Sequence, residues 1–249
     1  MKICNTPLGE VRVGSQEELF TTFAALLREV VEQTPYPPGV ALTGGSSPKA
    51  LFRWLAAHDS RLPEAKRDII FSVSDERHVP IASDESNYGN AERLLLDPLG
   101  VTPDHRFPWD TGRTLNEAAL WYEKLWSLSF GEGKAYDLCM LGMGDDCHTA
   151  SLFPGSPLLD LASMDSDHRL FAALEVPGKG GRLTITPRGL EACARIVILV
   201  MGEGKADALK RVFDTQPASY SEIPIRLMNR FPGKVVWLVD EPAASGLSL

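Results

Sequence analysis

The chain has 249 residues, of which 44% are hydrophobic and 23% are charged, so a soluble globular protein is expected and a disordered or fibrous one is excluded. Lysine and arginine total 25 against 33 aspartate and glutamate residues, and the net charge of -8 argues against a general binder of nucleic acid or of anionic membranes. A small anionic substrate remains compatible with this charge, because a few local cations can outweigh a global deficit.

The first predicted element is a helix that begins after Ser15. Ser15 and Glu18 have the spacing of a capping box, and apolar residues then recur at helical spacing as far as Val30. The segment 34–39 contains three prolines and a glycine, which end the helix. Residues 40–43 then predict a short buried strand.

A turn at Gly44 and Gly45 leads into the second predicted helix. A serine at position 46 or 47 caps this helix and Pro48 suits its first turn, so it is expected to run to about Ala57. The polar segment 75–86 is expected to be a loop. Further strands are expected at 69–74, 137–141, 171–176, 183–186, 196–201 and 235–239, and further helices at 86–96, 114–130 and 205–213.

Buried apolar runs that alternate with helices predict the α/β class, a Rossmann-like, mostly parallel sheet with helices on both faces. No shift in composition divides the chain, so residues 1–249 are interpreted as one domain. Ligands of such folds bind beyond the carboxyl ends of the strands. The loops at those ends are therefore expected to converge on one site; they are 44–47, 75–88, 142–151 and 202–205.

The sequence indicates neither secretion nor a membrane span. The stretch 1–13 lacks the apolar core of a signal peptide, and the longest strongly apolar run, 196–201, is far shorter than the roughly 20 residues of a membrane helix. The four cysteines form no CxxC pair, so reduced thiols are expected and a structural zinc site is not. The cytoplasm is the expected location.

The segment from Thr43 through Gly44 and Gly45 to Ser46 has the order strand, glycine turn, helix. This order suits an anion-binding turn, because glycines let the backbone approach a ligand and the N–H groups at the helix start point towards it. An ordinary glycine turn before a capped helix is the alternative. A Walker loop is excluded, since no GxxxxGK[ST] run occurs.

The segment after the strand at 137–141 holds the strongest candidate for acid–base chemistry. Its glycines, Gly142 and Gly144, lack the third glycine of a dinucleotide fingerprint, so NAD binding is disfavoured. Asp145, Asp146 and His148 follow at the strand end, where an imidazole oriented by a carboxylate can act as a general base. A solvated surface histidine is the alternative, and metal ligation by these residues is possible but not demanded by their spacing.

Three cations lie near candidate strand ends or glycines. Arg77 could clamp an anion or stabilise an oxyanion, or it could brace its own loop through an ion pair. Arg182 and Lys205 each stand beside glycines. A phosphate-binding role for these two becomes attractive only if both converge on the glycine turn.

Taken in chain order, several segments resemble the 6-phosphogluconolactonases of the glucosamine/galactosamine-6-phosphate isomerase-like superfamily. The resemblance extends from about residue 40 to Trp237, and the ordered set is more specific than any one piece. The segments are Thr43-Gly-Gly-Ser-Ser-Pro-Lys49, Ser74-Asp-Glu-Arg-His-Val-Pro80, Ser86-Asn-Tyr88, Leu141-Gly-Met-Gly-Asp-Asp-Cys-His-Thr-Ala-Ser-Leu-Phe-Pro154, Arg182-Leu-Thr-Ile-Thr186 and Gly202-Glu-Gly-Lys205.

The resemblance implies hydrolysis of 6-phosphogluconolactone to 6-phosphogluconate, in the oxidative pentose phosphate pathway, without a cofactor. It maps the general base onto His148 and the catalytic arginine onto Arg77, and Asp146 or Asp145 is expected to orient the imidazole. No metal, nucleic acid or membrane partner is expected, and the protein is expected to be a monomer or a weak homodimer. The expected substrate- and phosphate-binding residues are Thr43, Gly44, Gly45, Ser46, Asp75, Arg182 and Lys205.

One position departs from the family pattern, because Cys147 stands where the family usually has glycine. If this position needs a positive φ, a cysteine there costs about 1 kcal/mol and could tilt His148. Its thiol would be sensitive to oxidation only as a thiolate.

Two alternative functions remain open. One is a deaminase or isomerase of an aminosugar phosphate, with Asp75 as base, although the run 151–154 departs from the Phe-Asn-Glu-Pro type usual in deaminases. The other is a non-catalytic sensor of sugar phosphates.

Overall fold

The structure, a computed structural model, describes residues 1–247, and these residues contain a seven-stranded sheet. Its order is β1-β2-β10-β9-β6-β3-β4, in which β1 runs antiparallel to β2 and all other neighbours are parallel. The strands are β1 Lys2–Thr6, β2 Gly9–Gly14, β3 Gly39–Leu42, β4 Ile70–Val73, β6 Leu138–Leu141, β9 Arg195–Val200 and β10 Val235–Asp240.

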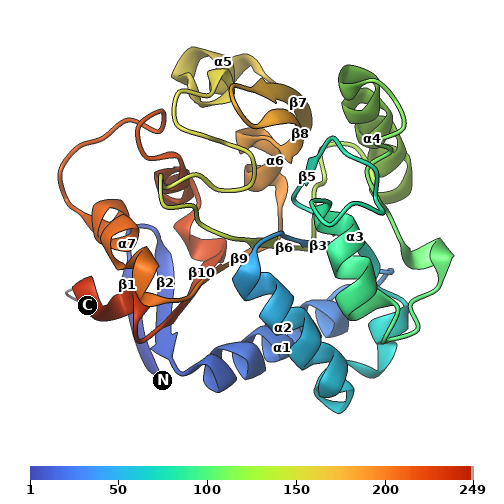
Figure 1. Ribbon diagram of the computed structural model, residues 1–249, viewed down its shortest axis with the longest axis horizontal. Coiled ribbons are helices and arrows are strands. Elements are labelled where there is room, and N and C mark those ends of the chain that lie inside the picture. The colour runs from blue at the N-terminus through green and yellow to red at the C-terminus, as the bar shows by residue number, and fades with distance from the viewer. Residues whose placement is uncertain (248–249) are drawn as a thin grey trace.

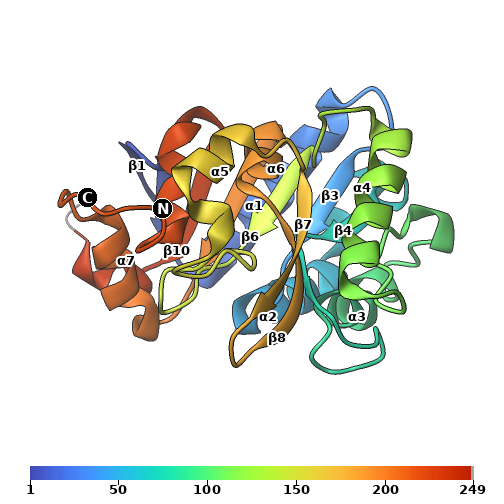
Figure 2. The ribbon, with the colours of Figure 1, turned by 90° about the horizontal axis from the view of Figure 1, so that it is seen from above.

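Helices cover both faces of this sheet, as the α/β prediction requires. Figure 1 shows α1 and α2 on one side and α4, α5 and α6 on the other, and Figure 2 shows the same layers from above. The central strands read as continuous apolar runs because both of their faces are buried. The helices are α1 Gln16–Gln33, α2 Ser46–Ala57, α3 Asn87–Ala91, α4 Leu115–Phe130, α5 Leu161–Ser166, α6 Pro187–Ala192 and α7 Ala206–Phe213.

A second, three-stranded antiparallel sheet has the order β5-β8-β7, with β5 Asp75–Arg77, β7 Phe171–Val176 and β8 Gly180–Ile185. The prediction of a loop over 75–86 is therefore wrong at its start, because residues 75–77 pair with β8. Helix α4 supports this sheet through an aromatic layer, in which the rings of Trp109 and Tyr122 stack with centroids 3.8 Å apart. The Tyr122 hydroxyl lies 2.5 Å from Ser72 Oγ on β4, which links α4 to the main sheet.

The sequence predicts most elements of the main sheet correctly. The capping box of α1 forms as expected, with Ser15 Oγ accepting from Glu18 N and the Glu18 carboxylate accepting from Ser15 N. Helix α3 continues into a π-helical turn, Glu92–Leu96, within the predicted 86–96 segment. The hairpin of β1 and β2 was not predicted, because β1 is an edge strand whose side chains are mostly exposed. No helix within residues 1–247 has the length and apolar character needed to cross a bilayer.

Candidate active site

A cavity of about 230 Å³ opens at the carboxyl ends of β3, β4, β6 and β9. Strands β3 and β6 are neighbours at the centre of the sheet. The strand that follows β3, β4, is added at one edge of this pair, whereas the strands that follow β6, β9 and β10, are added at the other edge. The cavity therefore lies at the point where the strand order reverses. Residues of all four predicted loops line it, as expected. The lining residues are Thr43, Gly44, Gly45, Ser46, Ser47, Pro48, Asp75, Arg77, Asn87, Gly142, Met143, Gly144, His148, Ala150, Leu199, Val200, Met201 and Lys205.

The glycine turn brings the start of α2 to the edge of this cavity. Gly45 precedes α2 with a φ of +117°, and within residues 1–247 no side chain caps the first turn of the helix, so the prediction that Ser46 or Ser47 caps it is wrong. Gly44 has no room for a side chain, since a Cβ there would lie 1.9 Å from Asn87 Oδ1. The first-turn N–H groups of a helix lack intrahelical partners, so the turn is suited to binding an anion.

Asp75 forms a buried acidic wall of the cavity. Its side chain is held by Ser151 Oγ, which donates to Asp75 Oδ2 at 2.7 Å, and its backbone carbonyl accepts from Asn87 Nδ2 at 2.9 Å. The sequence patterns indicate no role for Asn87 or Ser151, although both lie in the segments that carry the family resemblance. Asn87 lines the cavity, and its side chain occupies the space that a Cβ at Gly44 would need.

The Glu76 side chain joins the two ends of the 75–88 segment through hydrogen bonds. Its buried carboxylate accepts hydrogen bonds from Arg77 N, Asn87 N, Tyr88 N and Ser86 Oγ, at 2.7–2.9 Å. Burial raises the pKa of Glu76, and these four donors oppose that rise. The carboxylate thus fixes the start of α3, and with it the position of Asn87.

Arg77 and Arg182 stand opposite each other in the pairing of β5 with β8. Arg77 lines the cavity and donates from Nη1 to the Glu85 carbonyl at 2.6 Å, whereas Arg182 does not line the cavity. Burial, and next the charge of Arg77, lower the pKa of Arg182. Within residues 1–247 neither guanidinium forms an ion pair, but the charges of Asp75, Glu85 and Glu76 act on Arg182 and partly balance the positive charge of this wall.

His148 borders the cavity with its imidazole held against Asp146. Its Nδ1 lies 2.5 Å from Asp146 Oδ1, and its backbone N–H donates to the same oxygen at 3.1 Å. Gly144 leaves space for the ring, because a Cβ there would lie 2.0 Å from Nδ1. The Phe153 ring packs on the imidazole with centroids 4.3 Å apart.

The charge of Asp146 determines which imidazole nitrogen carries the proton. Burial raises the pKa of Asp146, but the hydrogen bonds and charge interaction with His148 lower it, so that the resulting pKa lies below the ordinary value. An ionised carboxylate only accepts hydrogen bonds, so Nδ1 must be the protonated nitrogen of the neutral imidazole. Nε2 then keeps its lone pair and can accept a proton from a water molecule.

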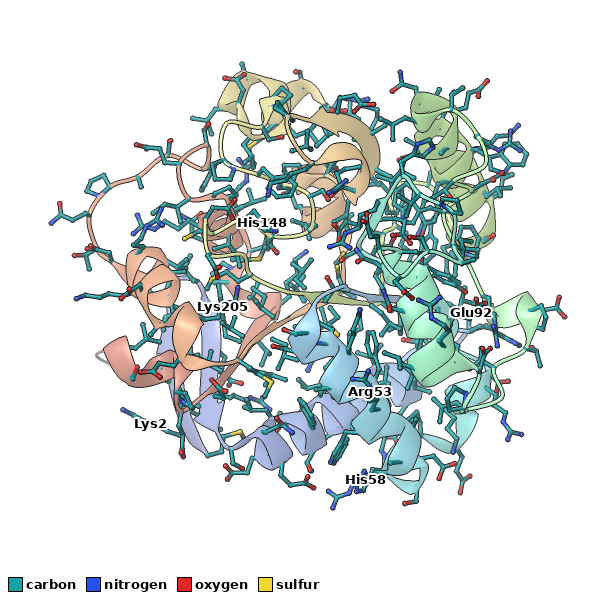
Figure 3. The ribbon with its side chains drawn as sticks, viewed as in Figure 1. Lys2, Arg53, His58, Glu92, His148 and Lys205 are labelled. Atoms are coloured by element: carbon teal, nitrogen blue, oxygen red, sulfur yellow. The ribbon has the colours of Figure 1, made fainter. Side chains whose placement is uncertain are left out.

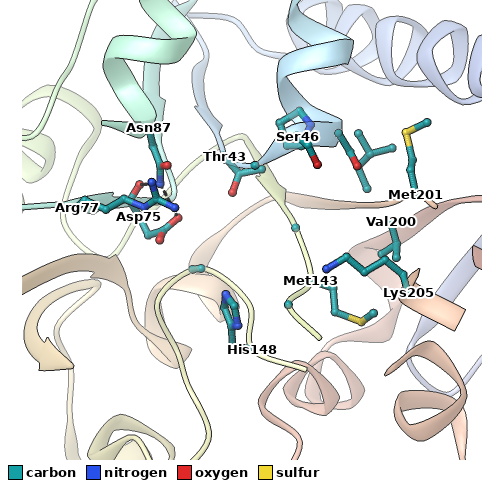
Figure 4. A pocket seen from close by; sticks show the side chains of 18 residues that line it. Thr43, Ser46, Asp75, Arg77, Asn87, Met143, His148, Val200, Met201 and Lys205 are labelled. Carbon is teal, nitrogen blue, oxygen red and sulfur yellow. Dashed lines mark hydrogen bonds between the residues drawn. The ribbon is translucent and has the colours of Figure 1, made fainter. Parts of the chain in front are cut away.

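The two neighbouring aspartates have separate partners. Asp145 Oδ1 accepts from Lys205 Nζ at 2.6 Å, whereas Asp146 contacts His148. Lys205 immediately precedes α7 and lines the cavity. In Figure 4, Arg77 and Lys205 extend towards the cavity from opposite sides, and His148 lies between them.

Cys147 adopts the left-handed conformation that the family glycine would favour, with a φ of +65°. Its side chain is fully buried and does not line the cavity, and Sγ lies 3.7 Å from the Ala208 carbonyl of α7. Burial raises the pKa of the thiol, so the thiolate needed for rapid oxidation is disfavoured. Within residues 1–247, no group of three or more histidine, cysteine, aspartate or glutamate side chains has the arrangement of a metal site.

Comparison with known proteins gives consistent matches over most of the chain. Residues 14–237 match the family described as glucosamine-6-phosphate isomerases/6-phosphogluconolactonase. The chain is 33% identical over 217 residues to a 6-phosphogluconolactonase of Haemophilus influenzae, which covers 86% of this chain and 89% of that relative. A probable 6-phosphogluconolactonase of Arabidopsis thaliana is 29% identical over 255 residues, covering 96% and 94%. A solved 6-phosphogluconolactonase from Trypanosoma cruzi has a TM-score of 0.79 at 28% identity, covering 96% and 97%.

Proposed function

The chain belongs to the family of glucosamine-6-phosphate isomerases and 6-phosphogluconolactonases, and from this premise we propose that it hydrolyses 6-phosphogluconolactone to 6-phosphogluconate, a step of the oxidative pentose phosphate pathway. The observation that carries the proposal is the pairing of His148 with Asp146 at the edge of a cavity that also contains an uncapped helix start and Lys205. The proposed unit is one domain of residues 1–249, acting in the cytoplasm on a small phosphorylated sugar lactone.

The substrate phosphate binds at the glycine turn. The backbone N–H groups of Gly44, Gly45 and Ser46 accommodate its oxygens, Lys205 supplies a facing positive charge, and Thr43 borders the same turn. Arg182 pairs with Arg77 and does not line the cavity, so the predicted convergence of Arg182 and Lys205 on the turn is not met, and only Lys205 is proposed as the phosphate-binding cation. Anchoring the phosphate at one end of the cavity places the lactone carbonyl near His148, and such positioning supplies a large part of the rate enhancement.

His148 acts as the general base on a water molecule. Nε2 takes a proton from the water, the water oxygen attacks the lactone carbonyl carbon, and Arg77 stabilises the oxyanion that develops. When the tetrahedral intermediate collapses, the bond from that carbon to the ring oxygen breaks, and the imidazolium returns its proton to the ring oxygen. Asp146 holds the ring orientation throughout and stabilises the imidazolium.

The assignment requires a particular form of the imidazole. Only the neutral ring can accept a proton, so His148 must be uncharged, with Nε2 unprotonated, when the water molecule attacks.

One structural observation supports the alternative function as a deaminase or isomerase. Asp75 is buried and lines the cavity, so a carboxylate is available that could abstract a proton from a sugar carbon. The relatives described above carry lactonase names instead, which supports hydrolysis.

The deciding assay offers both substrates to the wild-type protein. Freshly generated 6-phosphogluconolactone should disappear faster than its spontaneous hydrolysis, and glucosamine 6-phosphate should release no ammonia. Ammonia release without lactone hydrolysis would establish the deaminase alternative. Binding of 6-phosphogluconate with neither activity would establish the sensor alternative.

A further inference from the structure

A buried arginine outside the cavity joins the segments that carry the candidate catalytic loop. Arg226 lies in the 3₁₀ helix η7, Pro224–Arg230, and is only 8% exposed. Its guanidinium donates four hydrogen bonds to backbone carbonyls, and within residues 1–247 it forms no ion pair. The acceptors are Arg211 O at 2.7 Å, Val212 O at 3.0 Å, Asp214 O at 2.6 Å and Gln216 O at 2.6 Å.

These acceptors lie at the carboxyl end of α7 and in the turn that follows it. The last carbonyls of a helix lack intrahelical partners, and a cation among them is favoured by the helix dipole. The planar guanidinium with its five fixed donors can hold several carbonyls at once, which a lysine cannot do in the same geometry. Arg226 therefore fixes η7 to the end of α7.

The segment around η7 in turn holds the loop that carries His148. Ile225 N donates to the Cys147 carbonyl at 3.1 Å, and Ser221 O accepts from Gly155 N at 2.9 Å. These two hydrogen bonds fix both ends of the segment 147–155. Cys147 is strained by its positive φ, and such a conformation persists only when neighbouring structure imposes it.

We propose that Arg226 is a positioning residue for His148. It holds η7 in the place from which Ile225 N supports the backbone of Cys147, the residue directly before the imidazole. The proposal rests on the proposed function, because it assigns a role in the reaction for which His148 is the base. It predicts that the loss of Arg226 misplaces the imidazole without removing any group that touches the substrate.

The amino-terminal end of α7, next to Lys205, is held by contacts that do not involve Arg226. Gly202 N donates to both carboxylate oxygens of Asp240 at 2.9 Å, and Lys205 follows three residues later. Arg226 acts at the opposite end of the helix, so Lys205 should keep its place when the arginine is changed. The expected signature is therefore a fall in kcat with little change in KM.

The test compares Arg226→Met with Arg106→Met as a matched control. Arg106 is another largely buried arginine, which binds Val101 O, Glu92 and Asp97 and contacts neither the cavity nor the 147–155 segment. Its partner Glu92 lies on the opposite side of the molecule from Lys205 (Figure 3). Melting temperature, kcat, KM and the Kd for 6-phosphogluconate are measured for both variants and for Arg226→Lys.

Because an error of about 1 Å in the position of a catalytic group can cost about 100-fold in rate, kcat of Arg226→Met should fall roughly 10- to 100-fold. KM and the Kd should stay within about threefold of wild type, since no ligand contact is lost. Arg106→Met should lose stability but keep the wild-type kcat.

If Arg226→Met does not fold, Arg226→Lys takes its place, with the same fall in kcat expected. A folded Arg226 variant with wild-type kcat would overturn the proposal, and so would an equal loss of kcat in Arg106→Met. These outcomes are distinct from failure of the proposed function, in which the wild-type protein itself would not accelerate lactone hydrolysis.

Discussion

Replacing Asp146 by asparagine tests how the imidazole is oriented. The substitution keeps the size of the side chain but removes the charge that holds the proton on His148 Nδ1, which now lies 2.5 Å from Asp146 Oδ1. An asparagine can offer its NH₂ group to the ring instead of its oxygen, and the ring would then carry the proton on Nε2, where it cannot act as a base. The rate should fall because part of the population holds the wrong tautomer.

The size of this effect is bounded by the structure. General base catalysis contributes roughly 10²–10⁴-fold in total, and loss of the orienting group removes part of that factor. The Asp146 side chain is 44% exposed, so water can replace some of its contact with the ring. We expect kcat to fall roughly 10- to 100-fold. KM should change little, because Asp146 does not line the cavity.

The assay is lactone hydrolysis with the spontaneous rate subtracted, and Asp145→Asn is the control. Asp145 pairs with Lys205 instead of with His148, so its loss should leave kcat unchanged and affect only KM. If Asp146→Asn keeps kcat within about twofold of wild type, the orienting role derived from this contact is wrong. Equal losses of kcat in both variants would also contradict it.

The same contact predicts a pH dependence of stability. The pKa of Asp146 in the folded protein lies below its ordinary value, so the ionised carboxylate stabilises the fold at pH values above the ordinary range of an aspartate. This contribution is lost as the pH falls through the lowered pKa. The stability difference between wild type and Asp146→Asn should therefore shrink on acidification, as measured by chemical denaturation.

Three further substitutions test other parts of the site. Gly44→Ala should cost about 1–3 kcal/mol of unfolding free energy and raise KM, because the new Cβ meets Asn87; a wild-type melting temperature would refute the packing argument. Cys147→Gly should shift the melting temperature by less than about 4 °C and keep the wild-type kcat. The reason is that glycine tolerates the positive φ, which offsets the loss of a buried thiol. A large loss of kcat would show that the thiol is needed. Lys205→Ala should raise KM about tenfold or more, because a charge-assisted contact to phosphate is lost, and an unchanged Kd for 6-phosphogluconate would place the phosphate elsewhere.

Local sequence patterns predicted the parts of the fold that depend on local interactions. The capping box at Ser15 and the glycine turn at Gly44 have signals within a few residues, and both form where expected. The convergence of the four loops followed from the general rule for parallel sheets. The sequence also left Asp145 and Asp146 as equal candidates, because only the three-dimensional path of the loop assigns Lys205 to one and His148 to the other.

Contacts between distant segments could not be predicted in this way. The pairing of β5 with β8 joins residues about 100 positions apart and has no local signature in a segment as short as 75–77. In the sequence, Glu76 resembles an exposed loop residue. Its carboxylate is nevertheless buried, because backbone N–H groups of α3 donate hydrogen bonds to it. The carbonyls that Arg226 binds, at the end of α7 and in the turn after it, likewise precede it by 10 to 15 positions.

The most direct test of the account compares wild-type protein with His148→Ala for 6-phosphogluconolactone hydrolysis and for 6-phosphogluconate binding. The account predicts that the variant hydrolyses lactone little faster than the spontaneous reaction, while its Kd for 6-phosphogluconate stays close to wild type. A variant that binds the product normally and retains the wild-type rate would contradict the account, because the base would then be another group.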